Sequence, residues 1–284
     1  MRILLLLMLI QSFNAFSQDV IVGRVISEQT GEPVAFASVT LMNTNIGTNA
    51  DSSGKFTLRT VIMFPDTLLI SSVGYKECKI LVANLDGNIL IKMTPYNIEL
   101  DPLIIRTYKS IQKISSFPSC GSDLFVNDGY VIQMAKKFTV PIGGCKLQFI
   151  ELCKSTRNAR FRIRVYRTNP LNSSIPDEDL MDSVLEVISS KQRIKVDLSS
   201  YQIIIPDSSF FVAIEWLLLP ENITKDKKTH PVKMNSSIKY APFIGIKLTN
   251  GRSVNSIALK DFQGRWRAVH FSFEPLISVV LETP

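Results

Sequence analysis

Period-two alternation is the feature that most constrains what this chain can fold into. From Asp19 onward, short runs of β-branched and aromatic residues alternate with polar neighbours, and turn residues interrupt them about every eight to twelve positions. No stretch has the regular helical spacing of apolar residues that an amphipathic helix needs. The chain has 284 residues, of which 45% are hydrophobic and 20% are charged. This length and composition allow two packed domains, so we predict an all-β fold made of two sandwiches.

Residues 1–17 are typical of a signal peptide. Arg2 is positively charged, residues 3–10 are apolar without interruption, and Ala15-Phe16-Ser17 places small residues at the spacing of a cleavage site. This apolar stretch is shorter than the roughly 20 residues that cross a bilayer. A later apolar stretch, residues 203–219, contains Pro206 and Glu215, which favour two strands over a membrane span. We expect an exported protein of the cell envelope, located in the periplasm, at the outer-membrane periphery or on the cell surface, that does not span the membrane.

Four cysteines remain after removal of the predicted signal: Cys78, Cys120, Cys145 and Cys153. Export places them in an oxidising compartment, which favours disulfides. They form no C-x-x-C pair and have no histidine at ligand spacing, so a zinc site is not expected. Cys145 and Cys153 could face each other across a hairpin, and Cys120 is another candidate partner. Three connectivities therefore stay open, together with buried free thiols.

Six short motifs occur in a fixed order in the first part of the chain. They are Gly23-Arg24-Val25, Thr30-Gly31-Glu32-Pro33-Val34, Ala37-Ser38-Val39, Gly47-Thr48, Asp51-Ser52-Ser53-Gly54-Lys55-Phe56 and Ile70-Ser71-Ser72-Val73-Gly74-Tyr75. This series resembles the carboxypeptidase regulatory-like domain of Bacteroidetes-type bacteria. The resemblance implies a transthyretin-like β-sandwich over residues 18–94, without catalytic residues of its own. Because the matched positions are turn glycines, prolines and core apolar residues, we expect them to have structural roles.

Residues 95–118 are expected to be a linker, because Pro95, Pro102 and Pro118 interrupt them; residues 100–105 could add an edge strand to the first sandwich. Residues 119–284 are expected to form a larger, jelly-roll-like β-sandwich with one short helical turn within residues 177–185. Its pattern is similar to C-terminal sandwich domains of uncharacterised envelope proteins, which supports architecture only. The strands that we expect in it cover residues 136–140, 145–153, 160–166, 191–196, 202–205, 210–217, 243–248 and 277–281.

The sequence contains no recognisable catalytic or cofactor-binding pattern. The two histidines are His230 and His270; no H-x-x-E follows the first, and in a strand the second would lie about 13 Å from Glu274 along the backbone. There is no G-x-S-x-G elbow and no phosphate-binding glycine loop. An acidic cluster is interpreted mainly as a solvent-facing loop, with calcium binding or glycan hydrolysis as lesser alternatives. The cluster consists of Asp177, Glu178, Asp179 and Asp182. We predict no enzyme, no cofactor and no metal.

Two basic stripes are the candidate ligand-binding residues. In a strand, alternate arginines would place their guanidinium groups on one face, and a second run repeats the pattern. If the two strands were neighbours, one outer face would carry six positive charges able to bind an acidic glycan or lipopolysaccharide phosphate. The alternative is a solvated face that maintains solubility. The stripes are Arg160, Arg162 and Arg164, and Lys191, Arg193 and Lys195.

Two tryptophans are candidate sugar platforms. Trp216 lies in an apolar run and is expected in the core, whereas Trp266, between Arg265 and Arg267, is the better candidate for exposure. The formal charge of +7 is diffuse, and no nucleic-acid motif is present.

From these features we predict a non-enzymatic, exported envelope protein that acts as a binding or assembly module for a protein or glycan partner. Two alternatives remain: an accessory or regulatory component of an outer-membrane transporter or peptidase system, and, with less support, an undetected glycan-acting enzyme. The last of these would need two acids that converge in one cleft.

Overall fold

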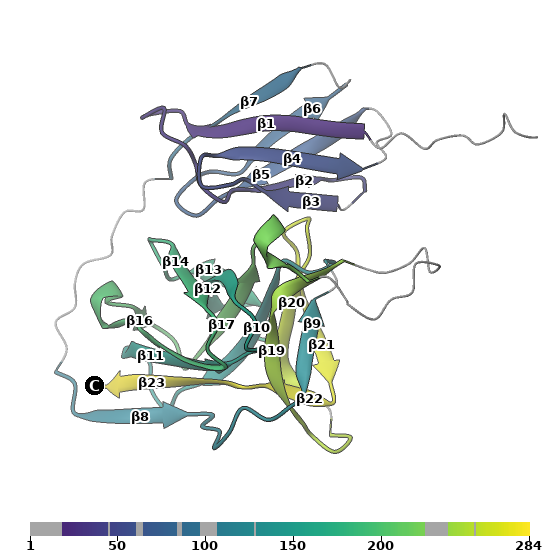
Figure 1. Cartoon of the computed structure of the whole chain (residues 1–284). Helices are drawn as coiled ribbons and strands as arrows, with labels where there is room; N and C mark the ends of the chain where they lie inside the picture. The colour runs from purple at the N-terminus through teal and green to yellow at the C-terminus, as the bar shows by residue number, and fades with distance from the viewer. Residues whose placement is uncertain are drawn as a thin grey trace, which may run out of the picture.

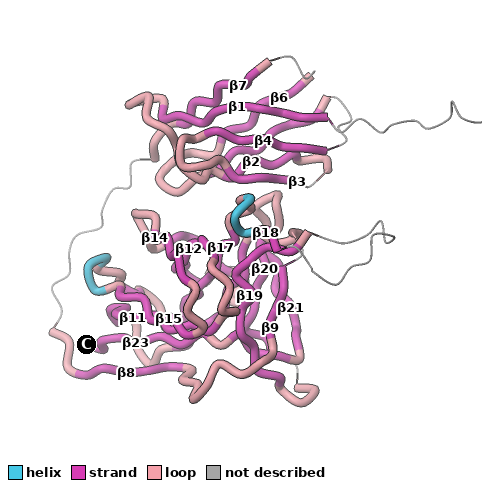
Figure 2. The backbone as a smooth tube through the Cα atoms, in the orientation of Figure 1, coloured by secondary structure: helices cyan, strands magenta, loops and turns pink. Residues whose placement is uncertain are grey.

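The computed structural model describes residues 19–44, 46–60, 65–83, 87–96, 107–127, 129–224, 238–252 and 254–284. Strands β1–β7 form one sandwich and β8–β23 form a larger one beside it (Figure 1). The only helical segments in these ranges are two short 3₁₀ turns, Ser199–Tyr201 and Pro220–Asn222 (Figure 2). The prediction of an all-β, two-sandwich fold is confirmed. The predicted signal peptide (residues 1–17), the suggested edge strand (100–105) and His230 lie outside the described residues.

The N-terminal sandwich consists of a three-stranded and a four-stranded sheet. In the first, β1 pairs antiparallel with β4 and parallel with β7, and in the second all pairs are antiparallel. A core of buried aliphatic residues and Phe56 joins the two sheets. In spatial order the three-stranded sheet contains β4 (Lys55–Thr60), β1 (Asp19–Ser27) and β7 (Asn88–Met93). The four-stranded sheet contains β3 (Ile46–Asn49), β2 (Ser38–Leu41), β5 (Asp66–Ser71) and β6 (Cys78–Val82).

Two motif glycines of this sandwich are required by close backbone approach. A Cβ on Gly23 would lie 2.5 Å from the carbonyl oxygen of Ile89 in the neighbouring strand. Gly54 has a φ of +77°, and a Cβ there would lie 2.4 Å from the Val25 oxygen. The Asp51 carboxylate orders the same turn by accepting hydrogen bonds from the Ser53 and Lys55 amides at 2.8 and 3.0 Å. These contacts give the motifs the structural roles that the sequence predicted.

The C-terminal sandwich is built around a seven-stranded sheet, which we call the cleft sheet because one of its faces is turned to the N-terminal sandwich. Its other face packs on the main hydrophobic core. In spatial order the cleft sheet contains β13 (Pro176–Asp179), β12 (Ala159–Thr168), β17 (Ser209–Trp216), β10 (Gln133–Thr139), β20 (Val254–Lys260) and β21 (Trp266–Phe271), with β14 (Leu185–Ser189) also paired to β12.

Two further sheets close this sandwich. The five-stranded one contains β15 (Arg193–Asp197), β11 (Cys145–Cys153), β23 (Ile277–Thr283) and β8 (Ser110–Ile114), with β16 (Ile204–Ile205) paired to β11. The four-stranded one contains β18 (Ile223–Thr224), β19 (Lys239–Leu248) and β22 (Phe273–Pro275), with β9 (Leu124–Asn127) paired to β19. Since β8 pairs with β23, this sandwich includes residues that we expected in the linker.

The helical turn that we predicted within residues 177–185 is wrong. Residues 176–179 form β13 and residues 185–189 form β14, and both strands pair with β12. Asp179 and Glu186, which lie on these strands, pair with Arg164 and Arg160 of β12 and help to hold the segment on the sheet edge.

A disulfide joins Cys120 to Cys153 with a Cα–Cα distance of 5.3 Å. The sequence left the partner of Cys153 open, and the structure pairs it with Cys120 and not with Cys145. Cys145 is a buried thiol whose Sγ donates to the Ile142 oxygen at 3.1 Å, and Cys78 is half-buried outside any disulfide. The bond ties the segment before β9 to the end of β11.

Lys154, the residue after this disulfide, gives the fold a pH dependence. Its side chain is fully buried, and Nζ donates to the carbonyl oxygens of Ser155 and Arg157 at 2.7 and 2.8 Å. Burial lowers the pKa of Lys154 to about 8. The unfolded chain, in which this pKa is ordinary, then binds more protons between about pH 8 and 10.4, so stability rises with pH in that window.

We therefore expect Lys154→Met to flatten this part of the pH profile. In urea unfolding between about pH 8 and 10, the free energy of unfolding of the natural chain should rise more steeply than that of the variant, by up to about 1.4 kcal/mol per pH unit. Lys146→Met, in the preceding strand β11, is the matched control and should keep the slope of the natural chain. If the free energy of unfolding had the same pH slope in the natural chain and in Lys154→Met, a lowered pKa of the buried Lys154 would be contradicted.

The two sandwiches contact each other through polar and aromatic groups. The Leu218 amide donates to Asn49 Oδ1 at 2.7 Å, and Gln263 Nε2 donates to the Met42 oxygen at 2.9 Å. A Cβ on Gly47 would lie 2.8 Å from the ring of Phe262, which shows how closely that ring approaches the N-terminal sandwich. These contacts come from β3 and the β2–β3 turn, and they fix one edge of the N-terminal sandwich over the cleft sheet (Figure 1).

Candidate functional site

A cavity of about 740 Å³ lies between the two sandwiches. Its floor comes from the cleft sheet, and its opposite wall comes from residues 71–75, Glu77 and Tyr96 of the N-terminal sandwich. The exposed acids Asp177 and Glu178 lie at its rim. The floor side chains are those of Gln133, Arg162, Arg164, Tyr166, Asp179, Glu215 and Lys260.

Strand register explains why these side chains share one face. Directly opposed residues of adjacent strands point to the same side of a sheet. One row of opposed residues crosses five strands and is polar: Arg162, Glu215, Gln133, Lys260 and Trp266. The next row begins with Arg164 and continues with small residues: Ala213, Ala135, Ala258 and Ala268.

The small residues leave room for the ring of Tyr166. Its hydroxyl donates to Gln133 Oε1 at 2.8 Å, so the ring spans the alanine row and reaches the polar row. Trp266 meets this ring edge-on with centroids 5.4 Å apart. Burial raises the pKa of Tyr166, and the nearby Asp179 carboxylate adds to the effect, so the hydroxyl stays protonated. The floor is thus flat, partly aromatic and edged by charges.

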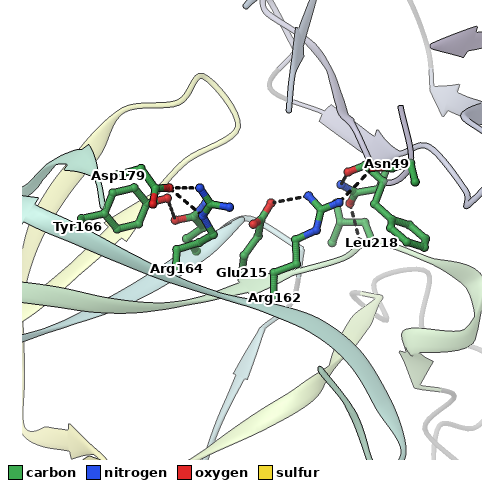
Figure 3. Close-up of polar contacts among 10 residues, drawn as sticks. Asn49, Arg162, Arg164, Tyr166, Asp179, Glu215 and Leu218 are labelled. Carbon is green, nitrogen blue, oxygen red and sulfur yellow. Dashed lines mark hydrogen bonds and ion pairs between the residues drawn. The ribbon is translucent and has the colours of Figure 1, made fainter. Parts of the chain in front are cut away.

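Arg164 is held by Asp179, which lies on the neighbouring strand β13. Arg164 Nε donates to Asp179 Oδ2 at 2.8 Å, and Nη2 contacts the same oxygen (Figure 3). The arginine is only 2% exposed. Burial alone would lower the pKa of Arg164, but the charge and hydrogen bond of Asp179, together with Tyr166 and Glu215, outweigh burial and raise that pKa, so the guanidinium stays charged.

Arg162 makes contacts with both sandwiches. Its Nη1 lies 3.7 Å from Glu215 Oε1 across the strand pair, and its Nη2 donates to the Ala35 oxygen of the N-terminal sandwich at 3.1 Å (Figure 3). The guanidinium carbon lies 5.6 Å from the centroid of the Phe36 ring, a cation–π distance. Arg162 is also 2% exposed, and burial lowers its pKa.

Three buried polar atoms of the floor have no hydrogen-bond partner among the described residues. They are Arg162 Nε, Arg164 Nη1 and Glu215 Oε2. A buried charged group without its full complement of hydrogen bonds costs about 1–3 kcal/mol or more. Two donors and one acceptor, all on residues of the cavity floor, therefore have no partner of their own.

The structure separates the two basic stripes, so the six-charge outer face that we considered does not form. Arg160, Arg162 and Arg164 do share one face of β12, but β15 belongs to the five-stranded sheet. The solvated-face alternative is also wrong for Arg162 and Arg164, because the N-terminal sandwich and Asp179 cover them. The sequence could show the alternation but not which strands become neighbours.

The other predicted site residues lie away from the cavity floor. Arg160 pairs with Glu186 at 2.6 Å, and its guanidinium carbon lies 5.3 Å from the Phe36 ring centroid. Lys191 is exposed in the turn before β15. Arg193 pairs with Glu151 at 3.2 Å, and Lys195 Nζ lies 3.8 Å from the ring centroid of Phe149. Trp266 is half-buried beside Tyr166.

Sequence reasoning missed Glu215, Gln133, Tyr166 and Lys260. The available signal was Glu215, a single acid in an apolar strand, which we used only as an argument against a membrane span. The acidic loop contributed Asp179 to the floor, whereas Asp177 and Glu178 remain exposed. Within the described ranges, no group of three or more His, Cys, Asp or Glu residues is arranged to hold a metal ion.

Fold and site together define a class: an all-β protein with two sandwiches and a charged cavity between them. Residues 21–105 match the CarboxypepD_reg-like domain family, so the N-terminal sandwich is a domain of this family. The chain is 31% identical over 102 residues to the TonB-dependent receptor SusC of Bacteroides thetaiotaomicron. That match covers 36% of this chain and 10% of the receptor, so the chain spans about a tenth of the curated relative's length.

Solved structures with similar folds are remote. A clostridial cysteine protease, Cwp84 after propeptide cleavage, gives a TM-score of 0.41 at 10% identity, covering 96% of this chain and 73% of that one. A DUF3823 family protein from Bacteroides ovatus gives 0.22 at 11% identity, covering 80% and 97%. TM-scores this low carry no argument about function. None of the described segments forms a helix with the length and hydrophobicity that a membrane crossing needs.

Proposed function

We propose that this protein is an exported, non-enzymatic binding module of the bacterial cell envelope that holds a glycan in the cavity between its sandwiches. The observation that carries the proposal is the set of unpartnered atoms in the cavity wall, with donors on Arg162 and Arg164 and an acceptor on Glu215. A sugar hydroxyl both donates and accepts hydrogen bonds, so a ligand rich in hydroxyl groups suits this mixture. Tyr166 and Trp266 supply aromatic surface nearby.

The envelope location rests on two supports. One is the signal-like segment at residues 1–17. The other is the similarity of the N-terminal region to part of an outer-membrane receptor. The same similarity supports an alternative in which the chain is an accessory component of a transporter or peptidase system, with the N-terminal sandwich as its docking part.

An enzyme is the other alternative, because two acids of the cavity floor, Asp179 and Glu215, approach the same space. We favour binding over hydrolysis because both acids are engaged. Asp179 Oδ2 accepts from Arg164, and Glu215 Oε1 lies opposite Arg162. Burial raises the pKa of Asp179 although the Arg164 guanidinium opposes this effect, so this carboxyl has one property of a general acid. Both of its oxygens already accept hydrogen bonds, however, Oδ2 from Arg164 and Oδ1 from the Met181 amide.

A glycan array tests this function. The full exported chain is expected to be retained on a subset of bacterial and host saccharides. Ser72→Trp, which fills the mouth of the cavity, should reduce the retained signal at least about tenfold. Ser190→Trp, in an exposed turn outside the cavity, is the matched control and should bind as the natural chain does.

Circular dichroism of both variants would confirm that they fold. Retention of no saccharide, or equal retention by a folded Ser72→Trp, would overturn the proposal. Release of reducing sugar from a retained oligosaccharide would show that the protein is a glycan-acting enzyme and not only a binding module.

A further inference from the structure

We infer that the cavity selects an acidic saccharide, whose carboxylate or sulfate group lies among Arg162, Arg164 and Lys260. This inference rests on the proposed function and names the class of its ligand. It is carried by the charges of the cavity floor and by the positions of the donors that have no partner.

The charges of the floor do not cancel. It contains three cationic side chains, those of Arg162, Arg164 and Lys260, and two carboxylates, those of Asp179 and Glu215. Each carboxylate lies against one of the arginines. The three remaining acids that line the cavity, Glu77, Asp177 and Glu178, are exposed, so water weakens their effect, although the Glu77 charge still acts on Lys260.

Lys260 is the floor cation that remains once Arg162 and Arg164 have been paired with carboxylates. No salt bridge to Lys260 occurs within the described residues, and its Nζ lies 5.7 Å from the centroid of the Trp266 ring. Burial lowers the pKa of Lys260, and the Glu215 and Glu77 charges oppose that effect only in part. An anion placed beside Nζ would therefore stabilise the ammonium, as ligand charges do in buried sites.

The three cations line the same cavity although Lys260 lies on a different strand from the two arginines. The order β12, β17, β10, β20 puts three strand spacings, roughly 14 Å, between the backbones of Arg164 and Lys260. The positive charge of Arg164 nevertheless contributes to lowering the pKa of Lys260, so the two cationic groups act on each other across the floor.

The unused N–H groups match an oxyanion. Arg164 directs Nε and Nη2 to one oxygen of Asp179, which leaves Nη1 without a partner. Arg162 uses Nη1 and Nη2 on Glu215 and Ala35, which leaves Nε. Two oxygens of one carboxylate or sulfate can accept from two such donors, while Glu215 Oε2 is left to accept from a neighbouring hydroxyl of the sugar.

Calorimetric titration of the full chain with paired probes tests this inference. The probes are trisaccharides of galacturonate and glucuronate, their neutral methyl esters, and a sulfated disaccharide of the chondroitin type. An acidic probe is expected to bind at least about tenfold more tightly than its neutral counterpart, because a hydrogen bond to a charged acceptor is stronger than one to a neutral acceptor. Whether uronates or the sulfated probe bind more tightly distinguishes the two oxyanions.

Lys260→Met should lower the ratio of acidic to neutral affinity, whereas Lys79→Met, on the exposed strand β6, should leave that ratio unchanged. Equal binding of the acid and its methyl ester would overturn the inference and leave the glycan-binding function standing. Binding of neutral saccharides alone on the array would do the same. Absence of binding to every saccharide would overturn both.

Discussion

Replacing Arg164 by alanine should destabilise the protein by about 3–5 kcal/mol, the usual cost of removing one partner of a buried ion pair. The arginine is 2% exposed and supplies two hydrogen-bond donors to a single oxygen of Asp179. Without it, the Asp179 carboxylate would remain in a protein environment with only the Met181 amide, which donates to Oδ1 at 2.9 Å. Urea denaturation at neutral pH, followed by circular dichroism, would measure this loss as a lower midpoint at unchanged slope.

The double variant Arg164→Met with Asp179→Leu separates the ion pair from packing. Because buried ion pairs are often replaceable by apolar groups of similar volume, this variant should regain most of the stability lost in Arg164→Ala. A matched surface pair provides the control: Lys113→Ala removes an ion pair with Glu151 in which the lysine is 37% exposed, and should cost less than about 1 kcal/mol. A loss for Arg164→Ala no larger than that for Lys113→Ala would contradict the buried pair.

Local alternation was the part of the fold that sequence could predict. The strand β11, Cys145–Cys153, has the bounds that we expected, and β12 and β17 differ from expectation by one or two residues at each end. These strands are long, rich in branched and aromatic residues, and bounded by turns. Among the strands that we missed, β13 and β22 are three or four residues long and partly polar, so no period can be read from them. We also missed β20 and β21, although they are seven and six residues long.

Non-local pairing explains most of what could not be predicted at the site. Arg162 and Arg164 occupy the face of β12 that alternation assigns to solvent, and a single sandwich would leave them there. The second sandwich and Asp179 cover that face, so both arginines become buried. The hydrophobic pattern of a strand shows which of its side chains face the core of its own sandwich. A polar face that another sandwich covers has the same pattern as a polar face that is exposed to water, so the sequence does not distinguish them.

The family resemblance had a similar limit. It led us to expect a sandwich of this family over residues 18–94, and the CarboxypepD_reg-like match to residues 21–105 confirms the family. We assigned the motif Ser71-Ser72-Val73-Gly74-Tyr75 a structural role, and the structure shows that it also lines the cavity wall. Gly74 has a φ of +78°, and the Tyr96 amide donates to its oxygen at 2.7 Å, so backbone geometry fixes this wall. One motif can therefore stabilise its own sandwich and shape the cavity shared with the next.

Because both sandwiches line the cavity, the proposed binding should require the whole chain. The floor residues belong to the C-terminal sandwich, but Arg162 Nη2 is anchored by the Ala35 oxygen, and the opposite wall consists of N-terminal residues. A ligand between them would add contacts to both, so its binding would also stabilise the junction between the sandwiches. In this arrangement the N-terminal sandwich contributes directly to recognition, in addition to any docking role.

Replacing Trp216 by alanine should cost about 3–5 kcal/mol, as removal of a large buried aromatic side chain generally does. Trp216 is 1% exposed and lies in the main core of the C-terminal sandwich, where its ring centroid is 6.0 Å from that of Phe125. Its indole Nε1 donates to the Pro242 oxygen at 2.7 Å, so the substitution both opens a cavity and leaves a buried carbonyl without its donor.

Two further variants test which part of this loss of stability comes from the missing hydrogen-bond donor and which from burial in the core. Trp216→Phe keeps most of the volume but loses the donor, and should cost about 1–3 kcal/mol. Trp266→Ala removes the other tryptophan, which is half-buried on the cleft face, and should cost less than Trp216→Ala because its site stays partly open to solvent. Urea unfolding followed by far-ultraviolet circular dichroism measures all three without relying on tryptophan fluorescence. If Trp266→Ala proved the more damaging of the two alanine variants, the assignment of Trp216 to the core and of Trp266 to the cleft face would have to be reversed.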